Sequence, residues 1–166
     1  KVKGYVSING EKVIAEGQAV MDHMYQNNLS TKFMKKSYRI KTGDSENGLF
    51  LHYITFERSG NVIPIGYGVR YKNGTQSILT PSSITSLTTK KTHGVYLDTE
   101  LIIKPYQMDD LNIVITDHYN SYSILDELSG IKKYFAKKYV GGEVIEMNGN
   151  ATVNGEPAFF NFFAVD

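Results

Sequence analysis

The chain has 166 residues, a formal net charge of +1 and no cysteine. A chain of this length can bury a core of its own, and a charge so close to zero gives no indication of a nucleic-acid partner. The absence of cysteine excludes disulfides, thiolate metal sites and cysteine nucleophiles. We therefore expect one globular domain over residues 1–166.

The N-terminal segment, residues 1–28, allows two interpretations. In one, a strand over residues 5–8 and a turn at Asn9-Gly10 precede a helix; in the other, a long helix runs from the start. Gly4 and the Asn9-Gly10 pair disfavour an unbroken helix, so we predict a helix over about residues 11–26. Residues 29–41 carry five basic residues and no acidic one, which is typical of a strand at a sheet edge.

The central segment, residues 48–81, has the pattern of an antiparallel meander. Residues 49–56 are apolar on both faces, which indicates a strand inside a sheet. Residues 63–71 alternate strictly, which predicts a strand with one face on the core; the apolar members are Ile63, Ile65, Tyr67, Val69 and Tyr71. Pro64 places the start of this strand at an edge or a bulge. Asn73-Gly74 then predicts a tight hairpin.

The second half of the chain adds strands and one predicted helix. Residues 81–92 are polar and fit a loop or a short strand, whereas residues 95–103 and 111–116 have strand patterns. Ser123 as N-cap, followed by Asp126, predicts a helix over about residues 123–140 that Gly141 ends. The apolar stripe of this helix comprises Ile124, Leu125, Leu128, Ile131, Phe135 and Tyr139. Residues 158–165 are apolar on both faces and should form a strand inside the sheet, packed against this helix.

The resulting fold class is α+β, with two helices and an antiparallel sheet of about six to eight strands. This layout, an N-terminal helix followed by an antiparallel sheet, looks like the soluble head of a type IV pilin, or a component of a secretion or conjugation machine. The resemblance is one of layout and carries over no residues. It implies a secreted or cell-surface domain that acts through protein contacts. No run of 18 apolar residues exists, so membrane attachment would require a segment absent from this chain.

The residues that could carry chemistry form no recognised motif. None of the four histidines has the spacing of a metal site, so we predict no metal, no cofactor and no catalytic residue. Gly66 and Gly68 lack the third glycine and the following helix of a phosphate-binding loop. Their missing side chains instead predict a notch on one sheet face, against which a helix or a ligand packs; we favour the helix.

Three functions remain open at this point. The first is a non-enzymatic, extracytoplasmic binding or assembly domain with a protein partner. The second is a small-ligand-binding domain with an apolar pocket. The candidate lining of that pocket is His52, Tyr53, Gly66, Tyr67, Gly68 and Tyr71. The third is an enzyme that uses His52 or His118 as a general base beside a carboxylate.

Overall fold

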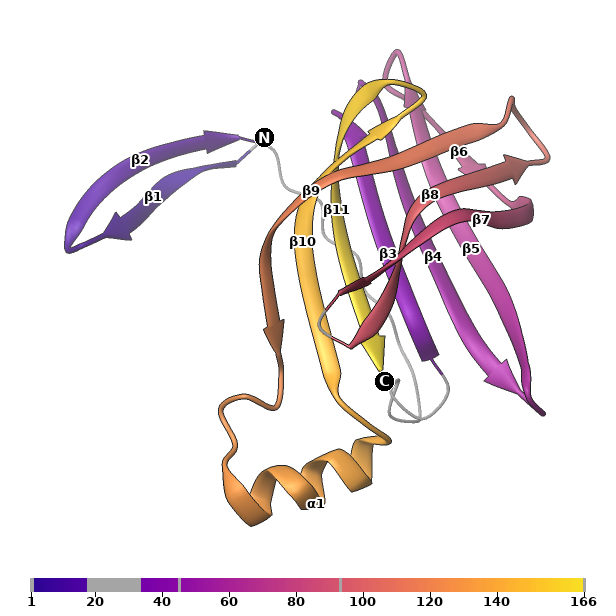
Figure 1. Cartoon of the computed structure of the whole chain (residues 1–166). Helices are drawn as coiled ribbons and strands as arrows, with labels where there is room; N and C mark the ends of the chain where they lie inside the picture. Colours follow the sequence, from indigo (N-terminus) through magenta and orange to yellow (C-terminus); the bar gives the residue numbers. More distant parts are fainter. Residues whose placement is uncertain (1, 18–33, 45, 93, 166) are drawn as a thin grey trace.

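The computed structural model describes residues 2–17, 34–44, 46–92 and 94–165, which are almost entirely antiparallel β-sheet (Figure 1). Eleven strands and one short helix lie in these ranges. The strands are β1 (Val2–Ile8), β2 (Glu11–Gly17), β3 (Met34–Gly43), β4 (Asn47–Arg58), β5 (Asn61–Lys72), β6 (Thr75–Leu79), β7 (Pro81–Thr92), β8 (Val95–Pro105), β9 (Leu111–Ser123), β10 (Val144–Val153) and β11 (Glu156–Val165). The helix is α1 (Gly130–Val140).

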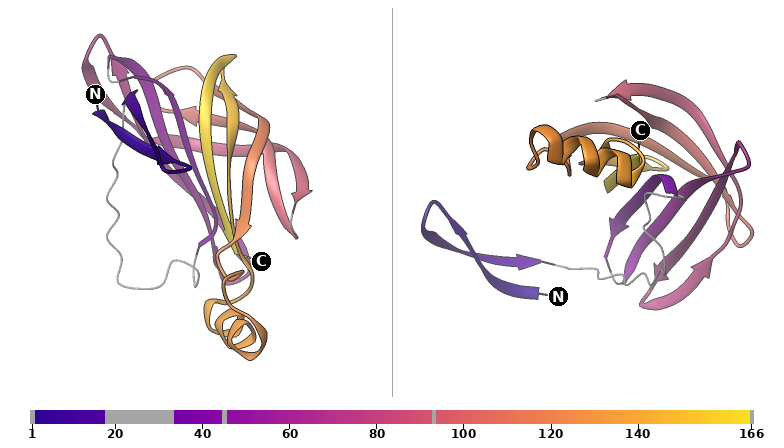
Figure 2. Two further views of the ribbon diagram at one scale, coloured as in Figure 1. Left: turned by 90° about the vertical axis from the view of Figure 1, so that its left-hand side faces the viewer. Right: turned by 90° about the horizontal axis from the view of Figure 1, so that it is seen from below.

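Nine strands form one sheet in the order β6-β5-β4-β3-β11-β10-β9-β8-β7. Neighbours in the sheet are neighbours in sequence, except that the last strand, β11, pairs with the first, β3. The sheet is therefore a meander that curls into a half-barrel (Figure 2). Its free edges are β6 and β7, which are consecutive in the chain with Thr80 between them, and β7 packs against β5 across the gap.

The concave side of the half-barrel holds the hydrophobic core. Tyr38, Phe160 and Phe162 are fully buried there, and the Tyr38 ring lies 4.8 Å from the Phe162 ring and 5.4 Å from the Tyr53 ring, centroid to centroid. The core extends along β8 and β9 through Leu101 and other aliphatic side chains. Every second side chain along these strands therefore points into a common interior.

Tight two-residue turns join several of the strand pairs. Asn9, Ser59, Asn73 and Asn154 each have φ between 50° and 53°, and each precedes a glycine with φ between 73° and 86°. Two consecutive positive φ values define the type I′ turn, whose twist matches that of the flanking strands. The predicted hairpin at Asn73-Gly74 is confirmed, and so is the turn at Asn9-Gly10.

The N-terminal helix predicted over residues 11–26 is wrong for residues 11–17, which form strand β2 and pair with β1 along their whole length. Residues 18–26 lie outside the described ranges. Over so short a segment, the spacing of Val13, Ile14 and Gly17 fits both the helical period of 3.6 residues and the strand period of two. The preceding Asn-Gly turn places the segment beside β1, where it forms a strand. The pilin-like layout rested on this helix and has no basis in the described residues.

The second predicted helix is shorter than expected and does not pack on the sheet. Strand β9 continues to Ser123, which pairs with Ile145 of β10, so α1 begins only at Gly130. Gly141 ends it in the left-handed region, at φ 95°, as predicted. No residue of α1 is buried. The α+β assignment is therefore wrong, and the described fold is antiparallel β with one short helix.

The predictions for β4, β5 and β11 have mixed outcomes. β4 and β11 lie inside the sheet as expected, each paired on both sides, but β11 is not covered by the helix. The edge position expected for residues 29–41 is wrong for the described part, because β3 is paired with β4 on one side and β11 on the other. The apolar side of β5 was expected on the core, and this is wrong: Ile65 and Tyr67 are 48 % and 45 % exposed. The glycine side of β5 faces the interior instead, because large side chains from β4 and β7 already fill the space there.

Candidate functional site

A pocket of about 670 Å³ opens at one end of the half-barrel, where several strands turn. We call it the end pocket. It is lined by Thr42, Gly43, Asn47, Gly48, Leu49, Arg70, Tyr71, Lys72, Met108, Val153, Asn154, Glu156 and Pro157. The volume lies within the range of small-molecule sites in proteins.

Hydrogen bonds between the turns hold the rim of the end pocket. The Asn73 backbone N–H donates to the Asn47 side-chain oxygen at 3.2 Å, which ties two neighbouring turns together. On the other side, the Asn112 N–H donates to the Asn154 side-chain oxygen at 2.7 Å, and the Asn154 N–H donates back to the Asn112 carbonyl at 2.8 Å. The rim is thus assembled before a ligand arrives, which lowers the entropic cost of binding.

The floor of the end pocket is apolar because it is continuous with the core. Leu49 and Val153 are 8 % and 5 % exposed and belong to the main hydrophobic cluster, and Met108 packs against that cluster from the loop after β8. A ligand in the pocket would therefore rest on aliphatic side chains. Removal of its apolar surface from water would contribute about 25 cal/mol per Å².

Two cations, Arg70 and Lys72, line the same pocket. Arg70 is half-buried, whereas Lys72 is exposed. The Arg70 guanidinium contacts the Met108 sulfur at 3.9 Å, and none of the ion pairs formed in the described ranges includes Arg70. A thioether is a weak acceptor, so the described residues leave most of the hydrogen-bonding capacity of this side chain unused.

The six residues predicted to line a pocket are divided between three places. Tyr71 lines the end pocket. Tyr53, Gly66 and Gly68 face the interior, while His52 and Tyr67 lie together on the convex side of the sheet. The structure therefore does not bring the six together in one site.

The predicted notch at Gly66 and Gly68 is filled by protein. A Cβ at Gly66 would lie 3.3 Å from both Ile84 Cδ1 and Pro81 Cγ, and a Cβ at Gly68 would lie 2.6 Å from Leu51 Cδ2. Strand β7, rather than a helix, covers Gly66. Gly66 lets β7 approach β5 across the gap in the half-barrel, and Gly68 leaves room for Leu51 of β4.

The two histidines considered as general bases differ in their surroundings. His52 is 2 % exposed; its Nε2 lies 2.9 Å from Ser37 Oγ and its Nδ1 lies 3.2 Å from the Tyr67 hydroxyl. His118 is half-buried on β9, and its backbone N–H donates to the Asp117 carboxylate at 2.8 Å. The described contacts of the His52 ring are with hydroxyl groups, which fits a satisfied histidine between strands.

A buried polar cluster was not found from the sequence. Asp98 is 4 % exposed; it accepts hydrogen bonds from the Tyr38 hydroxyl, Lys36 Nζ and Ser86 Oγ, each at 3.0 Å. Its backbone N–H donates to the Tyr38 oxygen at 2.7 Å. The available signal was a single aspartate that interrupts an apolar alternation, because such a residue must find partners across the core.

The environment of this cluster changes the acidity of two tyrosines. Burial is the main cause that raises the pKa of Tyr38 far above its ordinary value of 10.0, and the negative charge of Asp98 raises it further. Burial and then Asp98 also raise the pKa of Tyr53 from the same ordinary value. Both hydroxyls thus stay protonated at any physiological pH, which suits a structural role.

A second, smaller cavity of about 330 Å³ lies on the convex side of the sheet. It is lined by Arg39, Lys41, Phe50, Glu146, Asn148, Phe159 and Asn161. Its polar groups largely bind one another: the Asn161 amide donates to Glu146 at 2.8 Å and to Asn148 at 3.0 Å, and the Tyr122 hydroxyl donates to Glu146 at 2.8 Å. We therefore consider the end pocket the stronger candidate.

The described ranges contain no cluster of three or more His, Asp or Glu side chains able to hold a metal ion. Within the same ranges, no helix has the length and apolar character needed to cross a membrane.

Comparison with known proteins does not identify a family. No protein-family model matches the chain, and no curated protein is similar in sequence. Among solved structures, kievitone hydratase from Nectria haematococca is similar at 10 % sequence identity and a TM-score of 0.43, over 98 % of this chain. The chain spans about half (49 %) of the length of that structure.

Proposed function

We propose that this chain is a binding domain that takes a small ligand in the end pocket. The observation that carries the proposal is the coincidence, in one pocket of about 670 Å³, of an apolar floor with a rim fixed by hydrogen bonds. Pockets that combine a mostly apolar lining with a few polar groups are the usual small-molecule sites of proteins. That the domain is non-enzymatic and extracytoplasmic stays a prediction from the sequence.

Binding can be tested with the neutral fluorescent probe N-phenyl-1-naphthylamine and methyl-labelled methionine NMR. The chain has five methionines, and Met108 alone among those described lines the end pocket. The expected result is a probe-induced shift of the Met108 methyl signal without a comparable shift of buried Met34 or Met147. At a free probe concentration 100 times its Kd, binding would stabilise the fold by about 2.7 kcal/mol. This corresponds to a rise in Tm of about 5–11 °C.

A variant that occupies the pocket provides the control. Pro157→Trp places a large ring at an exposed position of the lining, and it should abolish the Met108 shift. Tyr106→Trp adds the same ring at a 74 % exposed position outside the lining and should leave binding unchanged. Probe binding that leaves Met108 unaffected, or that survives Pro157→Trp, would contradict the proposal.

Assembly through protein contacts is a second candidate, favoured by the hairpin of β1 and β2. Figure 1 shows this hairpin apart from the nine-stranded sheet, and all of its residues are exposed. One of its faces is mostly apolar and carries Val2, Gly4, Val6, Ile8, Val13, Ala15 and Gly17, with Glu11 beside the turn. The other face carries the Lys3–Glu16 ion pair, Lys12 above the Tyr5 ring, and Ile14 opposite Tyr5. An isolated hairpin is marginally stable in water, so we propose that its apolar face is covered by the same face of a second copy.

This second candidate is tested by the oligomeric state in solution. Val6→Lys and Val13→Lys, which are cross-strand partners on the apolar face, should each convert a dimer to a monomer in sedimentation equilibrium. Ser7→Lys, on the opposite face, is the matched control and should leave the dimer intact. A monomeric parent chain at high micromolar concentration would exclude self-assembly by this face.

A further inference from the structure

Arg70 gives the end pocket a chemical preference that the apolar floor alone would not have. Its guanidinium is half-buried beside the pocket and has the Met108 sulfur as its side-chain contact. An arginine is charged at every physiological pH, and it presents five donors in a planar fork. A partly desolvated guanidinium whose side-chain hydrogen bond within the described ranges is to a thioether gains strongly from an anionic oxygen pair.

The acidic residue that lines the end pocket does not neutralise this charge. Glu156 lines the same pocket, but it is exposed and forms no ion pair with Arg70. Lys72 adds a second positive charge at the exposed rim. The pocket therefore carries more positive than negative side chains, in a chain whose overall net charge is only +1.

The register of the strands places this charge next to the apolar floor. Arg70 on β5 is the cross-strand partner of Leu49 on β4, and Met108 touches both the guanidinium and the hydrophobic cluster. Side chains of directly opposed residues lie about 5 Å apart. One ligand can thus contact the cation with one end and the aliphatic floor with the other.

We infer that the end pocket recognises amphiphilic monoanions, in which a carboxylate, sulfonate or similar group binds Arg70 and an apolar body rests on Leu49, Met108 and Val153. This inference rests on the proposed function, since it names the ligand class of the same site. A neutral molecule of the same shape binds more weakly, because the Arg70 donors then stay without an acceptor.

Two probes that differ by one anionic group test this inference. The probe 1-anilinonaphthalene-8-sulfonate carries a sulfonate that N-phenyl-1-naphthylamine lacks, and the rest of the two molecules is the same. We expect the parent chain to bind the anionic probe at least about tenfold more tightly, which is the scale of a charge-assisted hydrogen bond. The Met108 methyl shift confirms for each probe that the measured binding is in the end pocket.

Variants at the two cations assign the preference. Arg70→Gln should weaken the binding of the anionic probe about tenfold and change the affinity for the neutral probe less than twofold. Arg70→Lys should cause an intermediate loss of affinity for the anionic probe, because lysine keeps the charge but lacks the planar fork of donors. Lys72→Gln, at the exposed rim, is the matched control and should cost less than about threefold. Circular dichroism of each variant checks that the fold is retained.

The outcomes separate the inference from the proposed function. If both probes shift Met108 with equal affinity, or if Arg70→Gln leaves the preference intact, then the inference is overturned and the binding site stands. If neither probe shifts Met108 in any folded variant, the proposed function fails and the inference fails with it.

Discussion

Asp98 shows at the scale of one residue how a curled sheet accommodates a charge in its interior. Three side chains from two strands far apart in sequence, β3 and β7, donate to the one carboxylate. A buried carboxylate is costly unless it is paired and hydrogen-bonded. The cluster joins opposite sides of the half-barrel, so its hydrogen bonds connect these strands across the core.

Removal of this carboxylate should be strongly destabilising. Asp98→Ala leaves Lys36 and the Tyr38 hydroxyl without their acceptor, and the loss of one partner from a buried ion pair typically costs about 3–5 kcal/mol. Asp110→Ala is the matched control, because its ion pair with Lys104 at 3.5 Å is more than half exposed; it should change stability by less than about 1 kcal/mol. Urea unfolding of both variants makes the comparison, and equal losses would show that Asp98 is not a structural centre.

The two tyrosines near Asp98 predict how stability depends on alkaline pH. Their pKa values are raised in the folded state by burial and by Asp98, whereas the ordinary value is 10.0. The folded state thus binds more protons above pH 10, and this contribution to stability, complete below pH 10, is lost as the pH rises further. Each of the two tyrosines should add a slope of about 1.4 kcal/mol per pH unit.

Denaturant titrations between pH 9 and pH 11.5 measure that slope. Tyr38→Phe should reduce the slope by the contribution of one proton, about 1.4 kcal/mol per pH unit. Tyr106→Phe, at a 74 % exposed position, should leave the slope unchanged. An unaltered slope in the Tyr38 variant would contradict the assignment.

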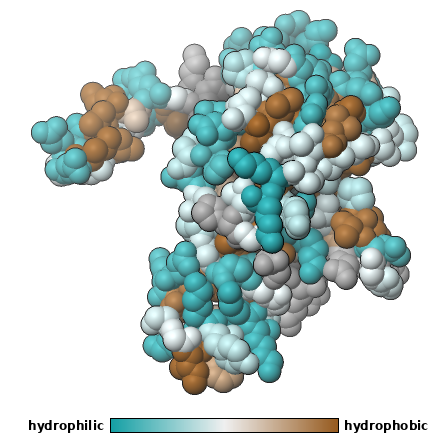
Figure 3. All heavy atoms as spheres, in the orientation of Figure 1, coloured by the Kyte–Doolittle hydropathy of each residue, from teal (hydrophilic) through white to brown (hydrophobic). Residues whose placement is uncertain are grey.

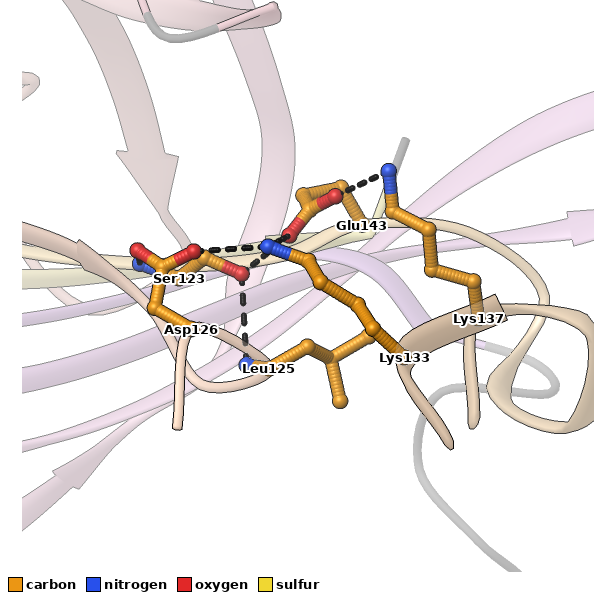
Figure 4. A network of polar contacts seen from close by, with 6 residues as sticks. All are labelled: Ser123, Leu125, Asp126, Lys133, Lys137 and Glu143. Atoms are coloured by element: carbon orange, nitrogen blue, oxygen red, sulfur yellow. Dashed lines mark hydrogen bonds and ion pairs between the residues drawn. The ribbon is translucent and has the colours of Figure 1, made fainter. Parts of the chain in front are cut away.

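At the scale of the element, α1 is held by charge on one side and is uncovered on the other. Glu143 forms an ion pair with Lys137, accepts a hydrogen bond from Ser123 and lies 3.5 Å from Lys133, while Lys133 donates to Asp126 at 2.7 Å (Figure 4). The opposite side exposes Ile131, Phe135 and Tyr139, of which each side chain is at least 60 % exposed. Figure 3 shows hydrophobic surface both on α1 and on the hairpin of β1 and β2.

This network predicts that α1 loosens in acid. The hydrogen bond from Lys137, and then that from Ser123, lowers the pKa of Glu143 below its ordinary value of 4.5. The hydrogen bond from Lys133 likewise lowers the pKa of Asp126 below 3.8. The stabilisation is therefore complete above pH 4.5 and is lost as the pH falls through the lowered pKa values.

Hydrogen-exchange protection factors of residues 130–140 should then fall between pH 5 and pH 2.5, before those of the sheet. Glu143→Gln should remove most of this pH dependence, and Glu127→Gln, in the neighbouring exposed segment, should not. Uniform protection of α1 across this range would show that the ion pairs do not hold it.

The central strands, the last strand and their turns could be predicted from the sequence, as could the end of α1 at Gly141, but the N-terminal hairpin and the start of α1 could not. Asn73-Gly74 and the double-sided apolar runs of β4 and β11 carry local signals that tertiary contacts reinforce. Residues 11–17 carry a pattern too short to distinguish a helix from a strand, and it is the pairing with β1 that makes them a strand. Residues 123–129 have a good capping pattern, yet the pairing of Ser123 with Ile145 extends β9 instead.

The candidate site was only partly predictable for a related reason. Of the predicted lining residues, Tyr71 lines the end pocket. Arg70 was missed, since the apolar alternation of β5 assigned it to the solvent side. Which side of β5 faces inward depends on its contact with Ile84 and Pro81 of β7. The curvature of the sheet that brings β7 there cannot be predicted from the sequence of β5 alone.

For the whole molecule, the curvature depends on the contact between β5 and β7 across the gap. Gly66→Val should cost about 1–3 kcal/mol, because the new side chain would collide with Ile84 and Pro81. Combination with Ile84→Ala makes room and should recover at least about 0.5 kcal/mol of that loss in a double-mutant cycle. Gly60→Val is unsuitable as a control because Gly60 has φ 78°; Gly4→Val, at an open position of β1, serves instead. If urea unfolding shows that the stability losses of Gly66→Val and Ile84→Ala simply add in the double variant, then contact with β7 does not limit the curvature of the sheet.

The pairing of β3 with β11 also determines when the half-barrel can be completed on the ribosome. Ile40 pairs with Phe160, about 120 residues later in the chain, whereas the other pairings join consecutive strands. At a synthesis rate of about 5–20 residues per second, β3 waits about 6–24 s for its second neighbour. During that interval one edge of β3 can pair with another nascent chain, and Lys36, Arg39 and Lys41 give this strand positive charge on both of its faces, a feature that discourages pairing with an identical strand.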